Sequence, residues 1–176
     1  MSRSLRVYLG HGASGTAASM KPFVDGLVRR GYEARAIDLP KRKAEDALPA
    51  LRELVPPAHD VVVGGHSFGG RVASLAAADV DAEYAALVCF SFPLHRPGAP
   101  ETAEARTAHL AAVRCPILFL SGEADPFARI ALLRATVERL PNAQLVTYPG
   151  VRHGLLPVLD DALDRVAAFL EPIAAR

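Results

Sequence analysis

A serine flanked by glycines has the clearest chemical potential in this chain. Ser67 lies in the segment GHSFG, residues 65–69, after the apolar run 60–64 and before an alanine-rich stretch of helical period. This is the G-x-S-x-G pattern, in which a tight turn between a strand and a helix leaves the serine hydroxyl exposed as a nucleophile. A glycine-rich turn without chemistry, as in many nucleotide-binding folds, is the alternative interpretation.

An aspartate and a histidine follow Ser67 in the order that a serine nucleophile of this kind requires. Asp125 comes directly after the apolar run 116–121, and His153 comes shortly after the run 144–148. In such sites the acid and then the base each lie on a loop after a later strand. The alternatives are a helix cap for Asp125 and an uninvolved loop residue for His153.

Acyl transfer also needs hydrogen-bond donors for the oxyanion, usually two backbone N–H groups. The N–H group of Phe68, directly after the serine, is the first candidate. For the second we choose Ala13, in the segment GHGASG that follows the first apolar run, with Gly12 or Ser14 as alternatives one step away. His11 in the same loop is expected to bind backbone groups and hold the loop in place.

These residues must be positioned by a regular alternation of short apolar runs and helical stretches. Such a rhythm predicts a parallel sheet of about six strands covered by helices on both faces, a three-layer α/β/α sandwich. The expected strands are residues 6–10, 33–37, 60–64, 86–90, 116–121 and 144–148. The expected helices are residues 17–30, 43–54, 68–78, 104–113, 127–140 and 157–170.

One segment, residues 91–102, breaks this rhythm because it carries Pro93, Pro97 and Pro100. Closely spaced prolines favour a loop, and loops at the carboxyl ends of parallel strands form the ligand crevice of open α/β sheets. We therefore expect this loop to form one wall of the site. His95 and Arg96 are candidates for contacting a polar or anionic substrate group, with a solvated surface role as the alternative.

The other histidines indicate neither a metal site nor a cofactor site. His66 is expected to serve packing or turn geometry, whereas His59 and His109 are interpreted as surface residues. No two histidines have the spacing of metal ligands, and the glycines after the first strand do not match G-x-G-x-x-G. The prediction is therefore no metal, no nicotinamide and no other cofactor.

Length and composition favour one soluble globular domain spanning residues 1–176. The chain is 51% hydrophobic and 22% charged with a net charge of +1, and its basic residues form no run. Nucleic acid is therefore not an expected partner, and no window approaches the ~18–20 apolar residues of a membrane span. Cys89 and Cys115 fit buried reduced thiols, and we predict a cytoplasmic protein. No feature predicts an oligomeric state.

The chain resembles the α/β-hydrolase superfamily along nearly its whole length. Within it, the chain is similar to the small serine hydrolases related to dienelactone hydrolases, the testis-expressed 30 group. The matching stretches read HGASG, GGHSFGGR, FPLHRPGAPE and GEADPF. Dienelactone hydrolases proper have cysteine where this chain has Ser67, and the narrower group often has arginine where it has His66.

The resemblance implies a serine nucleophile at Ser67 with Asp125 and His153 as its partners. It also implies a minimal α/β-hydrolase fold without a lid domain, because only a loop and one helix fit between the strands at 86–90 and 116–121. The leading hypothesis is hydrolysis of a small-molecule carboxylic ester or thioester through an acyl-enzyme on Ser67. The alternatives are a non-catalytic interaction module with the same fold, and an amidase or peptidase.

Overall fold

The computed structural model describes residues 4–176, and its centre is a sheet of six strands in the order β2-β1-β3-β4-β5-β6. Every neighbouring pair in this sheet is parallel, which confirms the predicted sheet. The observed bounds lie within two residues of the predicted ones. The strands are β1 (Arg6–Gly10), β2 (Glu33–Ile37), β3 (Val61–His66), β4 (Ala86–Phe90), β5 (Ile117–Gly122) and β6 (Ala143–Tyr148).

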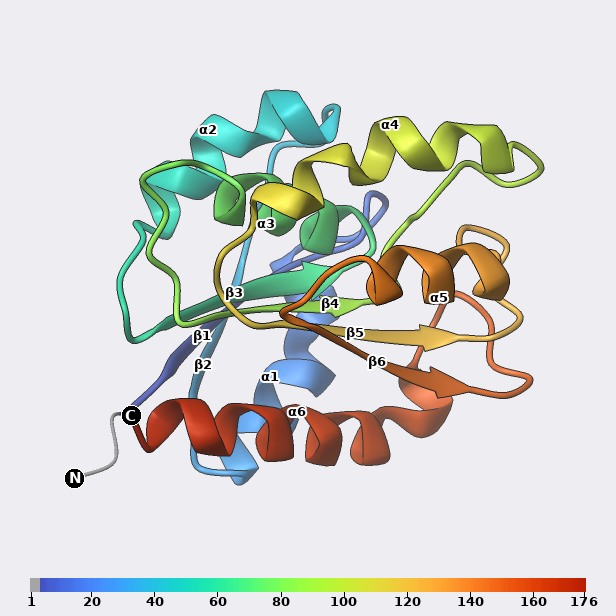
Figure 1. Ribbon diagram of the computed structural model, residues 1–176. Coiled ribbons are helices and arrows are strands. Elements are labelled where there is room, and N and C mark those ends of the chain that lie inside the picture. The colour runs from blue at the N-terminus through green and yellow to red at the C-terminus, as the bar shows by residue number, and fades with distance from the viewer. Residues whose placement is uncertain (1–3) are drawn as a thin grey trace.

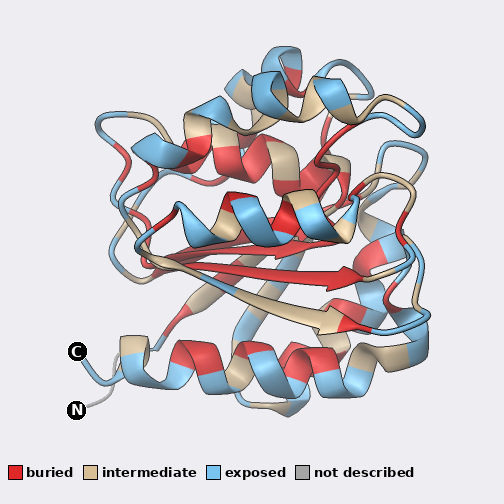
Figure 2. Cartoon of the chain, turned by 45° about the vertical axis from the view of Figure 1, so that its right-hand side comes forward, coloured by how far each residue is buried: buried red, intermediate tan, exposed pale blue. Residues whose placement is uncertain are grey.

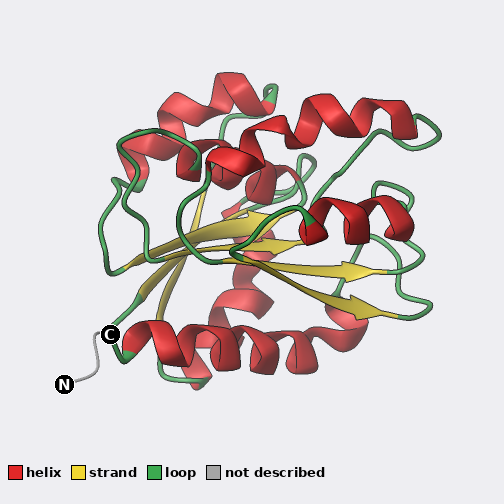
Figure 3. Ribbon diagram, viewed as in Figure 1, coloured by secondary structure: helices red, strands yellow, loops and turns green. Residues whose placement is uncertain are grey.

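Helices cover both faces of the sheet and complete the predicted three layers. Figures 1 and 3 show α1 and α6 below the sheet and α2, α3 and α5 above it. The α-helices are α1 (Lys21–Arg29), α2 (Ala44–Leu54), α3 (Phe68–Ala77), α4 (Ala103–Thr107), α5 (Ile130–Glu138) and α6 (Leu159–Ala174). Short 3₁₀ turns are η1 (Ala17–Met20), η2 (Pro100–Thr102), η3 (Ala108–Ala112) and η4 (Leu156–Val158).

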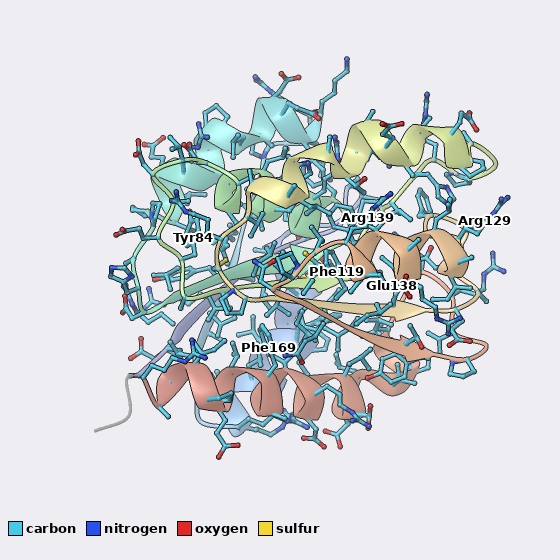
Figure 4. All side chains as sticks on the ribbon, viewed as in Figure 1. Tyr84, Phe119, Arg129, Glu138, Arg139 and Phe169 are labelled. Atoms are coloured by element: carbon cyan, nitrogen blue, oxygen red, sulfur yellow. The ribbon has the colours of Figure 1, made fainter. Side chains whose placement is uncertain are left out.

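Each face of the sheet has its own apolar core. One core joins the sheet to α2, α3 and α5, and Phe119 of β5 is buried in it. The other joins the sheet to α1 and α6, and Phe169 lies on the α6 side (Figure 4). The α6 helix shows a buried stripe toward the sheet and an exposed outer face (Figure 2). The central strands β3, β4 and β5 are buried almost throughout, as expected for strands covered on both faces.

Several predicted helices differ from the observed ones. The helix expected at 17–30 is the 3₁₀ turn η1 followed by α1, and the helix expected at 157–170 is η4 followed by α6, which extends to Ala174. The helix expected at 104–113 is divided into the short α4 and the 3₁₀ turn η3. The helix expected from Phe127 begins only at Ile130, because side chains bind the preceding backbone: Asp125 Oδ1 accepts from Phe127 N at 2.8 Å, and a histidine ring accepts from Arg129 N. These bonds keep residues 127–129 in a loop.

The strand order reverses direction at β1, since the chain goes from β1 to β2 on one side and then places β3 on the other. The chain segments that follow β1 and β3 therefore lead to opposite faces of the sheet, to α1 below and α3 above (Figure 1). In open α/β sheets such a switch point leaves the crevice in which ligands bind. Between β4 and β5 the chain forms a loop and short helices only, so the fold has no lid domain, as predicted.

The two cysteines are free thiols, as expected. Cys89 is fully buried in β4, and Cys115, just before β5, is half-buried. Burial raises the pKa of Cys115 to about 11, so this thiol is protonated at neutral pH. Within residues 4–176, no helix combines the length and the apolar character that a bilayer crossing requires.

Candidate active site

Ser67 occupies a sharp turn between β3 and α3. Its φ angle is +49°, in the left-handed region that serine rarely adopts. Glycine is required on both sides because the turn lies directly against β1. A Cβ atom on Gly69 would lie 2.3 Å from the backbone of Gly10, and one on Gly65 would lie 2.4 Å from the Gly10 oxygen. The turn thus holds the hydroxyl at the N-terminus of α3, above the carboxyl edge of the sheet.

The structure brings together the three side chains singled out in the sequence. The Ser67 hydroxyl donates to Nε2 of His153 at 2.7 Å. On the other side of the ring, Nδ1–H of His153 donates to Asp125 Oδ2 at 2.8 Å. The Asp125 side chain is 0% exposed and that of His153 is 23% exposed. A buried carboxylate so placed fixes the imidazole tautomer with Nε2 unprotonated and facing the serine.

Two aromatic rings contact the imidazole of His153. The ring of Phe127 lies against it with 4.3 Å between centroids, and that of His66 lies 5.3 Å away. His66 also donates from Nε2 to the backbone carbonyl of His153 at 3.1 Å. Burial lowers the pKa of His66, so its ring is neutral at pH 7. The expected role of His66 is packing, and the segment that it packs against is the loop of His153.

The loop after β1 is held against the serine turn by His11, as expected. This side chain is buried; Nδ1–H donates to the Gly12 carbonyl at 2.7 Å, and Nε2 accepts from Leu39 N at 3.0 Å. The His11 carbonyl accepts from Gly69 N at 2.9 Å, which ties the two loops together.

The two candidate oxyanion donors both border the space in front of Ser67. The lining of that space includes Ala13 and Phe68 together with Ser67. Among residues 4–176, neither N–H group donates to a backbone acceptor.

Nothing in the described part of the chain gathers three or more histidine, cysteine or carboxylate side chains in an arrangement suited to a metal ion. The polar groups at the site are a hydroxyl, an imidazole and a carboxylate. A model of the alpha/beta hydrolase domain matches residues 4–169, nearly the whole chain. The chain belongs to the alpha/beta hydrolase family.

Several solved structures have the same fold at low sequence identity. Est1E from Butyrivibrio proteoclasticus, solved with ferulic acid bound, has a TM-score of 0.81 at 18% identity, over 99% of this chain and 91% of that one. Esterase 2 from Thermogutta terrifontis, phosphorylated by paraoxon, has a TM-score of 0.76 at 21% identity, covering 98% and 84%. A monoacylglycerol lipase from Paleococcus ferrophilus has a TM-score of 0.75 at 15% identity, covering 99% and 97%.

In this alpha/beta hydrolase Ser67 borders a cavity of about 910 Å³, which we call the Ser67 cleft. The segment 91–102 forms one wall of it, as predicted, and contributes Pro93 and Arg96. Phe127 lines the cleft as well as supporting His153. Phe127 is not among the site residues predicted from the sequence. Its place two residues after Asp125 is a signal that could have identified it, because the loop that carries Asp125 must also pack near His153.

His95 is not placed to contact a substrate, so that prediction is wrong. The residue is only 4% exposed, and backbone groups use both of its ring nitrogens. Nδ1–H donates to the Arg96 carbonyl at 2.8 Å, and Nε2 accepts from Arg129 N at 2.9 Å. His95 therefore fastens the wall segment to the loop that carries Asp125, much as His11 fastens the loop after β1.

His109 also differs from its prediction as a surface residue. It is half-buried, and its Nε2 lies 2.8 Å from the Ser74 hydroxyl on α3. Burial, followed by the positive charge of Arg71, lowers the pKa of His109 to about 4. His59, by contrast, is exposed as expected.

Proposed function

We propose that this protein hydrolyses carboxylic esters or thioesters of small molecules through an acyl-enzyme on Ser67. One observation carries the proposal: the unbroken hydrogen-bond chain from the buried Asp125 through His153 to Ser67, with distances of 2.8 and 2.7 Å. A serine hydroxyl is a weak nucleophile until an oriented base takes its proton. The hydrogen bonds from Asp125 through His153 to Ser67 would provide such a base.

The first half of the reaction forms the acyl-enzyme. Ser67 Oγ attacks the carbonyl carbon of the substrate while His153 Nε2 takes the hydroxyl proton. The carbonyl electron pair moves to oxygen, where the N–H groups of Phe68 and Ala13 stabilise the oxyanion. When the oxyanion collapses, the bond to the leaving group breaks, and His153 gives its proton to the departing alcohol or thiol.

The second half restores the serine. A water molecule attacks the acyl carbon and gives a proton to His153. The tetrahedral intermediate then collapses, the bond to Ser67 Oγ breaks, and the proton returns to the serine. The products are the carboxylic acid and the free enzyme, so no cofactor is required.

The family membership and the structural similarity support a hydrolase, and the named neighbours are esterases and a lipase. The narrower relation to the testis-expressed 30 group is part of the proposal. It rests on Arg71 after the glycine pair and on the FPLHRPGAPE stretch, both of which contribute to the Ser67 cleft. A cytoplasmic location belongs to the proposal too.

Labelling with a fluorophosphonate tests the reactivity of the serine. The folded wild-type protein should become labelled at Ser67, and Ser67→Ala should not. A folded wild-type protein that takes up no label would support the non-catalytic module, and label on Ser67→Ala would place the nucleophile elsewhere. Parallel assays on an ester and the matched amide separate an esterase from an amidase.

A further inference from the structure

The Ser67 cleft is rich in positive charge. Its basic side chains outnumber its acidic ones, although the whole protein carries a net charge of only +1. The basic residues are Arg42, Lys43, Arg71, Arg96 and Arg106, and the acidic ones are Glu45 and Glu101. The cations come from three parts of the fold: the start of α2, the nucleophile helix α3, and the segment between β4 and β5.

Arg71 lies one helical turn after the serine, and its N–H group donates to the Ser67 carbonyl at 3.0 Å. Its side chain is only 15% exposed. Nη2 donates to Glu45 Oε1 at 2.5 Å, whereas Nε is buried with no acceptor among the described residues. Arg71 is thus a fixed guanidinium beside the nucleophile with an unused donor.

Arg96 and Arg106 add positive charge to the cleft without forming an ion pair in the described part of the chain. Arg106 Nη1 donates instead to the Pro93 carbonyl at 3.3 Å, in the cleft wall. Burial, followed by the positive charges of Arg71 and Arg96, lowers the pKa of Arg106. The three side chains are therefore near enough to act on one another.

Two arginines outside the cleft have carboxylate partners. Arg30, whose side chain is 16% exposed, binds two aspartates of α6, Asp160 and Asp164. Arg6 is paired with Asp60 in the same way. Burying a cation without a partner is costly, so a ligand is expected to supply charge where Arg106 is half-buried without an ion pair beside the largely buried Arg71. Arg96, which is exposed, adds its charge to the same cleft.

We propose that the substrate carries an oxyanion, a carboxylate or a similar group, which binds to Arg71, Arg96 and Arg106 while its ester carbonyl lies at Ser67. The guanidinium group suits this task because its fork of N–H donors matches the two oxygens of a carboxylate. This inference rests on the proposed function and narrows the proposed substrates from esters in general to anionic esters.

Two matched pairs of esters test the proposal and locate the anion. In the first pair the charge is on the acyl group: mono-4-nitrophenyl adipate against 4-nitrophenyl hexanoate. In the second it is on the leaving group: 4-carboxyphenyl acetate against 4-acetylphenyl acetate. We expect kcat/KM to be about tenfold higher or more for the anionic member of at least one pair. That preference should decrease as salt is added, because salt screens charge attraction.

The variants Arg96→Gln and Arg106→Gln separate charge recognition from a structural role. Each should lower kcat/KM for the preferred anionic ester several-fold, and the double variant about tenfold, with the neutral ester changed by less than about twofold. Arg139→Gln is the matched control, because Arg139 is an exposed arginine on the far end of α5, outside the cleft lining (Figure 4). It should leave both esters unaffected.

The outcomes distinguish this inference from the function on which it rests. Hydrolysis of neutral esters as fast as anionic ones would overturn the anion proposal and leave the esterase proposal standing. Equal losses for both members of a pair in the arginine variants would also overturn it. If the folded protein hydrolyses none of the four esters, both proposals fail.

Discussion

His66 donates a hydrogen bond from Nε2 to the backbone carbonyl of His153, at 3.1 Å, across 87 residues of sequence. The residue before Ser67 thus holds the loop that carries His153. Because the bond is made to the backbone, it controls where the imidazole stands without taking part in proton transfer. His66 is therefore a positioning residue, and its loss should affect turnover more than substrate binding.

The variant His66→Ala should lower kcat roughly 10–100-fold with little change in KM. A displacement of about 1 Å in a catalytic group can lower the rate by such a factor. His66→Gln retains an N–H donor and should recover part of the rate. Steady-state kinetics on a 4-nitrophenyl ester provide the measurement. Equal rates for the two variants would mean that the hydrogen bond does not matter.

A second prediction concerns the serine turn. Gly69→Ala should lower the free energy of unfolding by about 1–3 kcal/mol, because the new methyl group would meet the backbone of Gly10 at 2.3 Å. Gly154→Ala is the control, since no atom lies within 4 Å of a Cβ atom there, and it should change stability by less than ~0.5 kcal/mol. Urea denaturation measures both. Similar midpoints for the two variants would contradict the close approach of α3 to β1.

A third prediction concerns stability in acid. The pKa of His109 is about 4 in the folded protein, below the ~6.5 of an unfolded histidine, so the folded state binds fewer protons between these values. The stabilisation is complete above pH ~6.5 and is lost as the pH falls toward 4. The loss should be about 1–2 kcal/mol between pH 7 and 4.5, after allowance for solvent screening.

His109→Gln removes this titration, so its stability should fall less steeply than that of the wild type over the same range. His66, whose pKa is also lowered, contributes in the same direction and remains in the variant. Urea midpoints at several pH values measure the slopes. Parallel curves for the two proteins would show that His109 does not resist protonation.

The activity should also depend on pH. His153 must be neutral to accept the Ser67 proton, because a protonated imidazole has no free lone pair to receive it. The value of kcat/KM should therefore be low in acid, rise with pH and then level off. Rates for a neutral ester, measured where the protein remains folded, test this. A profile that is flat from pH 5 to 8 would argue against a histidine base.

Much of this site could be predicted because its residues follow strands. Ser67, Asp125 and His153 each come after an apolar run, and parallel strands bring all such positions to one edge of the sheet. Local sequence therefore determined their neighbourhood without any knowledge of tertiary contacts. The strand bounds were predictable for the same reason, since buried parallel strands are continuous apolar runs.

The errors concern side chains whose roles depend on distant partners. His95 and Arg96 are adjacent in one loop, yet His95 turns inward to the backbone of Arg129 and Arg96 lines the cleft. No feature of the neighbouring sequence indicates which of these two side chains turns inward and which lines the cleft. The burial of His109 likewise depends on Ser74, which is 35 residues away. The presence of Arg71 in the cleft lining could have been anticipated. Arg71 comes four residues after Ser67 in a helical segment, and residues with this spacing lie on the same face of a helix, one turn apart.

The claim that Ser67, His153 and Asp125 act as one unit is tested most directly by a double-variant comparison. Of mono-4-nitrophenyl adipate and 4-nitrophenyl hexanoate, the ester that the wild type hydrolyses faster should be used. Its hydrolysis should be measured for Ser67→Ala, His153→Ala and the double variant, with circular dichroism to verify folding. Ser67→Ala should lower kcat/KM by roughly 10⁴–10⁶-fold, and the combination should cost little more than either single change. If a folded Ser67→Ala retains most of the wild-type rate, the assignment of the nucleophile is wrong.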